Sequence, residues 1–285
     1  MKLEIKEKDM PFILSELALK AILYEVASYP TPGLVSPISS GIHKDMDYFT
    51  FIDSAVALNR FFIETVEIAM KEEDYKELFQ KIRMVGMDAE KHMLKATCGV
   101  NTHKGLIFIM IIALGATTLS LRKEKNFSSI RSGIKAMTEG IVHRELVNLD
   151  CNKKLSYGEK IYIKYGIPGI RKEVESGLPI IFDYSLPLYS GNKSLSKNDN
   201  IIHTLIGIMS RCDDTTLLHR KTIDTLEYVK NKAKEAMDLG GMNTELGKNA
   251  ILEMDEEFIK LDISPGGSAD LVAMTLFFYE VKKLF

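Results

Sequence analysis

Cysteine is scarce in this chain of 285 residues. The three cysteines, Cys98, Cys151 and Cys212, are odd in number, far apart and without a CxxC pair. We therefore expect neither structural disulfides nor a thiolate zinc site, and the pattern fits a reducing cytoplasm. The N-terminal stretch MKLEIKEKDMPF also lacks the apolar core of a secretory signal.

Two further absences exclude classes of partner. The net charge is −2, so the chain lacks the positive excess of a general nucleic-acid or membrane-surface binder. The longest apolar run, LIFIMIIALGA at 106–116, is about half of what a bilayer crossing requires. We expect that run to be a buried core helix.

Helical periodicity covers most of the chain. Stretches such as FILSELALKAILYEVASY and SADLVAMTLFFYEVKKLF repeat apolar residues every three to four positions, and no convincing alternating strand is present. The pattern predicts an all-α protein, with residues 1–285 forming a single large domain of about ten to twelve helices. Glycine, proline and charged residues mark loops at 28–47, 164–179, 211–221 and 262–270. Long loops in compact domains are usually functional, so we expect functional loops at helix ends.

The stretch KATCGVNTHKGLIFIM at 95–110 places four polar residues before an apolar helix. Gly99 suits the left-handed end of one helix, and Asn101 or Thr102 can cap the next. His103 and Lys104 fall in the first turn, where a cation opposes the helix dipole but can help to hold a phosphate. A capped helix with a solvated lysine explains the stretch equally well.

Aspartates precede helices at two other loops. GIHKDMDYFTF contains Asp45 and Asp47 beside His43 and Lys44, and Mg²⁺ favours one or two carboxylates together with substrate phosphates. Asp47 taken alone is better explained as a helix N-cap.

The second aspartate pair is Asp213 and Asp214 in CDDTT. Helix capping is the better explanation for this pair in isolation. Together with the first pair, it could form a split metal site.

Two glycine-containing stretches offer anion contacts. In PGGSAD at 265–270, Gly266 and Gly267 allow close approach of a ligand and Ser268 can cap, although a plain loop-to-helix junction explains these residues as well. The Gly-Lys-Ser/Thr ending of a P-loop is missing. In YGIPGIRKEVESGLP, Arg171 could grip a phosphate, or simply form an exposed ion pair.

The order of these motifs resembles the triphosphoribosyl-dephospho-CoA synthase family. The resemblance spans roughly residues 20 to 280 and is carried by PTPGLV, GIHKDMDYFTF, GMDAEKHMLKATCGVNTHKG, YGIPGIRKE, DDTT and PGGSADLVA, with GVNTHKG and HKDMD the most specific. The chain departs from the family pattern at Thr31, where a lysine is common, at Lys172, where glycine is more usual, and at Cys98, often a glycine.

The resemblance implies a pentosyltransferase. ATP would donate its 5-triphosphoribosyl group to the ribose 2′-hydroxyl of 3′-dephospho-CoA and release adenine. The product would pass to the acyl carrier protein of citrate lyase, or of malonate decarboxylase, as a prosthetic-group precursor. The partners expected are ATP and 3′-dephospho-CoA, with no nucleic acid and no membrane, Mg²⁺ as cofactor, and a homo-oligomer left open. An α-linkage formed from a β-linked nucleotide would imply inversion by single displacement.

The resemblance also suggests roles for the candidate residues. Cleavage of a sugar–base bond requires negative charge near the sugar, a base for the hydroxyl and a hydrogen bond for the departing adenine, while a triphosphate requires cations and helix N-termini. The expected catalytic residues are Asp45, Asp47, His103 and Glu90, the last orienting His103 or Lys104. The expected substrate and phosphate contacts are His43, Lys44, Asn101, Thr102, Lys104, Arg171, Gly266, Gly267 and Ser268. The expected metal ligands are Asp45, Asp47, Asp213, Asp214 and Asp270.

Two other functions compete. A Mg²⁺-dependent N-glycoside hydrolase of the ADP-ribosyl type would also be helical with scattered aspartates, but it would release a base without needing dephospho-CoA. A non-catalytic nucleotide-binding helical protein would bind ATP or a CoA derivative and release no base.

Overall fold

Helices form nearly all of the regular structure. The computed structural model describes residues 6–149 and 155–285, which contain no strand beyond an isolated bridge between Ser36 and Ser39. The α-helices are α1 (Met10–Val26), α2 (Tyr48–Ala69), α3 (Tyr75–Ala96), α4 (Lys104–Lys123), α5 (Ser128–Thr138), α6 (Tyr157–Tyr165), α7 (Ile170–Glu175), α8 (Leu186–Gly191), α9 (Lys197–Met209), α10 (Thr215–Arg220), α11 (Ile223–Asp238), α12 (Glu245–Lys260) and α13 (Gly266–Val281).

The predicted all-α class is confirmed. The described residues hold thirteen α-helices, slightly more than expected, because α7, α8 and α10 have six residues each. Helices this short do not complete enough turns to show a period in the sequence. Of the three cysteines, Cys98 and Cys212 are free thiols, and Cys151 lies outside the described residues.

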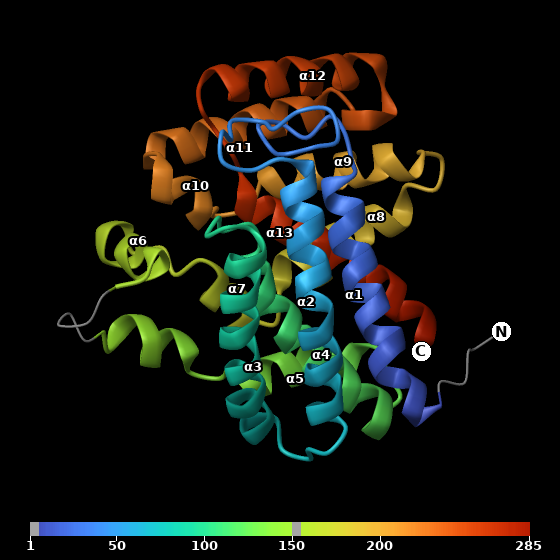
Figure 1. Cartoon of the computed structure of the whole chain (residues 1–285). Coiled ribbons are helices and arrows are strands. Elements are labelled where there is room, and N and C mark those ends of the chain that lie inside the picture. The colour runs from blue at the N-terminus through green and yellow to red at the C-terminus, as the bar shows by residue number, and fades with distance from the viewer. Residues whose placement is uncertain (1–5, 150–154) are drawn as a thin grey trace.

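Two apolar helices form the centre of the molecule. Helices α1 to α4 pack as successive neighbours, and α13 packs against α1, α4 and α9 (Figure 1). Most residues of α4 and α13 are buried, so neither helix needs a polar face. By length and composition α4 could cross a membrane, but 78% of its most apolar window is buried inside the protein. It is the core helix that the sequence predicted.

The segment between α1 and α2 closes one end of this bundle. It loops beside α11 and α12 in Figure 1. The Tyr29 backbone N–H donates to Asn198 Oδ1 (3.0 Å), and the Asn198 amide donates back to the Tyr29 carbonyl oxygen (2.8 Å). The Gly33 N–H donates to Asp255 Oδ1 (3.0 Å). These bonds fix a long irregular loop to helices distant in the sequence.

Gly33 is required where this loop meets the end of α12. Its φ is +70°, and a Cβ added there would lie 1.9 Å from the Ile263 carbonyl oxygen. Gly166 has the same φ of +70°, yet a Cβ there would meet nothing within 4 Å. The two glycines share a conformation and differ only in their surroundings.

We expect Gly33→Ala to cost more stability than Gly166→Ala. The left-handed conformation alone should cost about 1–2 kcal/mol at either site, and the clash at Gly33 should add about 1–3 kcal/mol. Urea denaturation of both variants measures the difference. An equal loss of unfolding free energy in both variants would show that the loop can move to relieve the clash at Gly33.

Candidate active site

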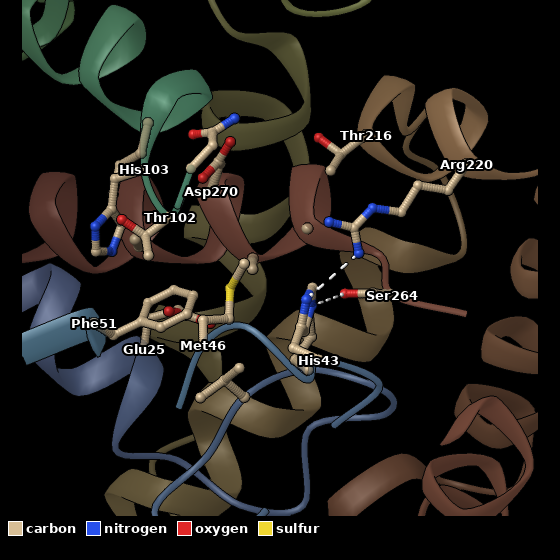
Figure 2. Close-up of a pocket in the computed structure, with 17 residues that line it drawn as sticks. Glu25, His43, Met46, Phe51, Thr102, His103, Thr216, Arg220, Ser264 and Asp270 are labelled. Carbon is tan, nitrogen blue, oxygen red and sulfur yellow. Dashed lines mark hydrogen bonds between the residues drawn. The ribbon is translucent and has the colours of Figure 1, made fainter. Parts of the chain in front are cut away.

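One pocket lies where six segments meet. It is bordered by the C-terminal turn of α1, the loop before α2, the first turn of α2, the start of α4, helix α10 and the start of α13 (Figure 2). Of the residues predicted for the site, it is lined by His43, Asn101, Thr102, His103, Gly266 and Asp270. Loops far apart in the sequence therefore converge on one cleft, at helix ends where functional loops were expected.

The loop aspartates do not reach this pocket. The side chain of Asp45 is 63% exposed and lies 3.9 Å from His43 Nδ1, outside the lining. Asp47 is the N-cap of α2, accepting from the Thr50 N–H (2.9 Å) in a capping box, as predicted for Asp47 alone. Lys44, between them in the chain, is exposed and does not line the pocket. This stretch therefore contributes His43, Met46 and Phe51 to the pocket, and not its aspartates.

The predicted phosphate-binding cations Lys104 and Arg171 form ion pairs with glutamates of the chain. Lys104 pairs with Glu90, so Glu90 contacts the lysine and not His103. Arg171 Nε donates to Glu145 Oε2 (2.8 Å), which also pairs with Arg83. None of these side chains lines the pocket. The predicted phosphate contacts from Lys104 and Arg171 are therefore not supplied in this structure.

The second aspartate pair divides into a surface residue and a structural one. Asp213 pairs with Lys230 (2.5 Å) outside the pocket. Asp214 is the buried N-cap of α10, as capping predicted, and accepts from Thr216 N and Leu217 N (both 3.0 Å). Burial raises the pKa of Asp214, while its N–H donors act in the opposite direction.

Asp214 also binds the start of α13. It accepts hydrogen bonds from Gly267 N (3.1 Å), Ser268 N (2.9 Å) and Ser268 Oγ (3.2 Å). Gly266 and Gly267 were predicted to allow the close approach of a ligand. The group that approaches this stretch is instead the carboxylate of Asp214. A Cβ at Gly267 would lie 2.7 Å from Asp214 Oδ1. Only Gly266 of this stretch's predicted phosphate contacts lines the pocket.

The start of α4 supplies a buried histidine. His103 is 3% exposed, and its Nδ1 lies 2.6 Å from Ser54 Oγ, which in turn accepts from Thr102 Oγ1 (2.7 Å). Phe51 packs edge-on against the imidazole with ring centroids 5.0 Å apart. The Nε2 atom has no hydrogen-bond partner in the described part of the chain. Burial lowers the pKa of His103 to about 3, so the ring is neutral near pH 7.

Asn101 lies at the mouth of the pocket and caps α4 from outside. Its Oδ1 accepts from the Lys104 N–H (3.1 Å), whereas the Thr102 hydroxyl bonds Ser54 and caps nothing. Of the two predicted caps, Asn101 is the one the structure uses.

Two carboxylates line the pocket. Glu25 on α1 is 7% exposed, and Asp270 on α13 is half-buried. Burial raises the pKa of Glu25 to about 8, and burial together with the charges of Asp214 and Glu25 raises that of Asp270. A Cβ at Gly105 would lie 2.3 Å from Asp270 Oδ2, so glycine leaves room for this carboxylate at the start of α4.

Sequence reasoning missed Glu25, although a signal was present. The residues Leu14, Ala18 and Ile22 mark the buried stripe of α1, and Glu25 continues that stripe three positions later. A buried acid costs free energy unless it is paired or protonated, so an acid on an inward-facing stripe is a candidate for a functional role. No hydrogen bond or ion pair joins Glu25 or Asp270 to another side chain within residues 6–149 and 155–285.

The other end of the pocket is cationic. Arg220 Nη1 lies 3.5 Å from His43 Nδ1, and His43 Nε2 lies 3.2 Å from Ser264 Oγ (Figure 2). Thr216 also lines this end. Burial, and then the charge of Arg220, lower the pKa of His43. Sequence reasoning missed Arg220, which stands four residues after the quoted DDTT stretch.

The five predicted metal ligands do not gather into one cluster. Within the described ranges no group of three or more His, Cys, Asp or Glu side chains is arranged to hold a metal ion. The acids that face the pocket are Glu25 and Asp270. Two carboxylates without protein cation partners suit Mg²⁺ when substrate phosphates complete its shell, which is how this ion is commonly held.

The three departures from the family pattern lie outside the pocket lining. Thr31 is 2% exposed in the fixed loop, and Lys172 pairs with Glu175 on the surface. Cys98 has a φ of +53°, a conformation in which the glycine more usual in the family would be relaxed.

We expect the stability of the protein to depend on pH through Glu25. Because its folded pKa of about 8 exceeds the ordinary 4.5, the protonated acid stabilises the fold fully below about pH 4.5, and this contribution is lost as pH rises through about 8. Urea denaturation without nucleotide or Mg²⁺ should show a steeper decline from about pH 5 to 8 in the wild type than in Glu25→Gln, by about 2–4 kcal/mol. Parallel curves would show that Glu25 is ionised in the folded protein.

Comparison with known proteins identifies the family. The family model described as CitG, ATP:dephospho-CoA triphosphoribosyl transferase, matches residues 12–285. A protein from Streptococcus pyogenes serotype M5, named probable 2-(5″-triphosphoribosyl)-3′-dephosphocoenzyme-A synthase, is 36% identical over 95% of this chain and 97% of its own length. A protein of the same name from Streptococcus equi subsp. zooepidemicus is 36% identical over 93% of this chain and 95% of its own.

A solved structure is also similar. The crystal structure of a proposed triphosphoribosyl-dephospho-CoA synthase from Archaeoglobus fulgidus superposes with a TM-score of 0.48 and 17% identity, over 81% of this chain and 98% of that one. The family match over nearly the whole sequence and the 36% identity to the relatives are enough to assign the family. The chain belongs to the CitG family of ATP:dephospho-CoA triphosphoribosyl transferases.

Proposed function

We propose that the protein transfers the 5-triphosphoribosyl group of ATP to the ribose 2′-hydroxyl of 3′-dephospho-CoA and releases adenine. The observation that supports this most directly is the division of chemical groups in the pocket. His103, Phe51, Glu25 and Asp270 lie toward one side, and Arg220 lies toward the other with His43 and Ser264 (Figure 2). ATP is divided in the same way, with base and ribose at one end and the triphosphate at the other.

The aromatic end suits the adenine. Phe51 and Leu106 offer apolar surface, and His103 Nε2 has no hydrogen-bond partner among the residues that the structure describes. As the bond from ribose C1′ to adenine breaks, negative charge develops on the base, and a hydrogen bond to a ring nitrogen stabilises that charge. His103 takes this role in the proposal, as a hydrogen-bond donor and not as a proton source.

The two carboxylates suit the ribose carbon. Positive charge develops on the sugar as adenine departs, and a nearby anion stabilises it. In the proposal Asp270 supplies that charge, while Glu25 accepts the proton of the attacking 2′-hydroxyl as its oxygen bonds to C1′. This is a single displacement with inversion, so no covalent enzyme intermediate forms. Glu25 then gives its proton to solvent, and adenine takes one from solvent.

The cationic end suits the triphosphate. Arg220 lines the pocket, and among residues 6–149 and 155–285 its guanidinium bonds only to His43; Ser264 and Thr216 line the same pocket. An arginine can bind phosphate oxygens bidentately. Mg²⁺, with Asp270 as its protein ligand beside phosphate oxygens, would neutralise the remaining charge when bound.

Further parts of the proposal come from the family. The product would be passed on as the precursor of an acyl carrier protein's prosthetic group, in the cytoplasm. A homo-oligomer is compatible with this role, and nothing in the pocket requires one.

We expect adenine to appear only when ATP, dephospho-CoA and Mg²⁺ are all present. Chromatography of the reaction should show adenine and the triphosphoribosylated product in equal amounts. Adenine released from ATP alone would favour an N-glycoside hydrolase. Binding of either substrate by calorimetry with no base released over hours would favour a non-catalytic protein.

We expect Asp270→Asn to lower kcat by at least about 100-fold, because it removes the negative charge beside the ribose. Asp45→Asn is the matched control, the same chemical change on an exposed aspartate outside the pocket, and should stay within about threefold of the wild type. Steady-state adenine release measures both. A larger loss of kcat in Asp45→Asn than in Asp270→Asn would show that the catalytic carboxylate lies in the loop before α2.

A further inference from the structure

We infer that Ser54 is a positioning residue that sets the tautomer of His103, so that the Nε2 proton points into the pocket. Ser54 lies on α2, is fully buried and was not among the residues predicted from the sequence. Ser54 does not itself line the pocket, and it acts through the imidazole. The inference deepens the proposed function, on which its kinetic part rests.

The inference rests on the hydrogen bonds that Ser54 makes. A serine hydroxyl has one proton to donate. Thr102 Oγ1 donates to Ser54 Oγ (2.7 Å), so the remaining neighbour for the serine proton is His103 Nδ1, 2.6 Å away. Nδ1 is then an acceptor, and in a neutral imidazole the ring proton must lie on Nε2.

The opposite tautomer is disfavoured by the same hydrogen bonds. If His103 Nδ1 carried the proton, the Ser54 proton could only turn to Thr102 Oγ1, and the Thr102–Ser54 hydrogen bond would have to reverse. The geometry gives that bond the opposite direction, with Thr102 as the donor. The relay from Thr102 through Ser54 to His103 therefore favours one arrangement.

The tautomer of His103 determines which kind of substrate group can bind at Nε2. Ring nitrogens of adenine other than the bonded one carry lone pairs, which a proton on Nε2 would meet favourably and a bare Nε2 would repel. His103 Nε2 is buried and without a partner in the described part of the chain. The hydrogen bonds from Thr102 and Ser54 thus leave an N–H donor at Nε2 in the pocket. The base of the nucleotide offers the acceptor for it.

The tautomer can be observed directly in the substrate-free protein. A ¹⁵N-histidine NMR spectrum, with His103 assigned by the His103→Gln variant, should show a protonated Nε2 and an unprotonated Nδ1. In Ser54→Ala the ring should shift toward the Nδ1-protonated form or a mixture. A wild-type spectrum with the proton on Nδ1 would overturn the inference, whether or not the protein transfers triphosphoribose.

Kinetics test the functional consequence. Ser54→Ala should lower kcat by about 10–100-fold with little change in KM for ATP, since the lost bond matters most as the base departs. Ser185→Ala is the matched control: Ser185 is equally buried and forms a 2.6 Å hydrogen bond with Thr275, but lies away from the pocket. It should leave kcat within about twofold. A folded Ser54→Ala with unchanged kcat would also refute the inference.

Thr102→Val provides a second variant in case Ser54→Ala fails to fold. Without the threonine donor, Ser54 Oγ can accept from Nδ1, so both tautomers of His103 should appear in the NMR spectrum. A single, unchanged Nε2-protonated form would show that Thr102 plays no part in the relay. If no adenine is formed by the wild type, the proposed function fails while the spectra still decide the tautomer.

Discussion

A single buried carboxylate, Asp214, holds together the two helix starts that border the pocket. Its oxygens accept backbone N–H bonds from the first turn of α10 and from the first turn of α13. The first N–H groups of any helix have no partner within it, so a buried helix start must find an acceptor elsewhere. One acceptor serving two helices fixes their relative position. Arg220 at the end of α10 and Asp270 in α13 face the same pocket because of this link.

The same link explains why the start of α13 is not free for phosphate. A helix N-terminus attracts an anion, and here the anion is already part of the chain. Among the described residues, Arg220 is the lysine or arginine whose side chain lines the pocket. In our proposal Arg220 takes the phosphate-binding role that the sequence analysis gave to Lys104, Arg171 and the helix starts.

Burial shifts the pKa values of the pocket's titratable groups toward their neutral forms. Burial raises the pKa of Glu25 and of Asp270 and lowers the pKa of His103 and of His43. Each shift favours the neutral form, since an ion loses solvation inside a protein. Binding of a charged nucleotide with Mg²⁺ would supply the countercharges that the empty protein does not. Substrate binding and ionisation of the carboxylates are in this way coupled.

The sequence by itself determined the helices, several of their caps and the segments that meet at the site, because these depend on neighbours a few residues apart. Asp47 and Asp214 cap helices as their positions predicted, and the family resemblance was carried by motifs in loops. Tertiary structure alone decided which polar side chains face the cleft. Asp45 and Lys104 turn toward the surface, whereas Glu25 and Arg220 turn inward. Those orientations depend on packing between distant helices, which no local pattern encodes.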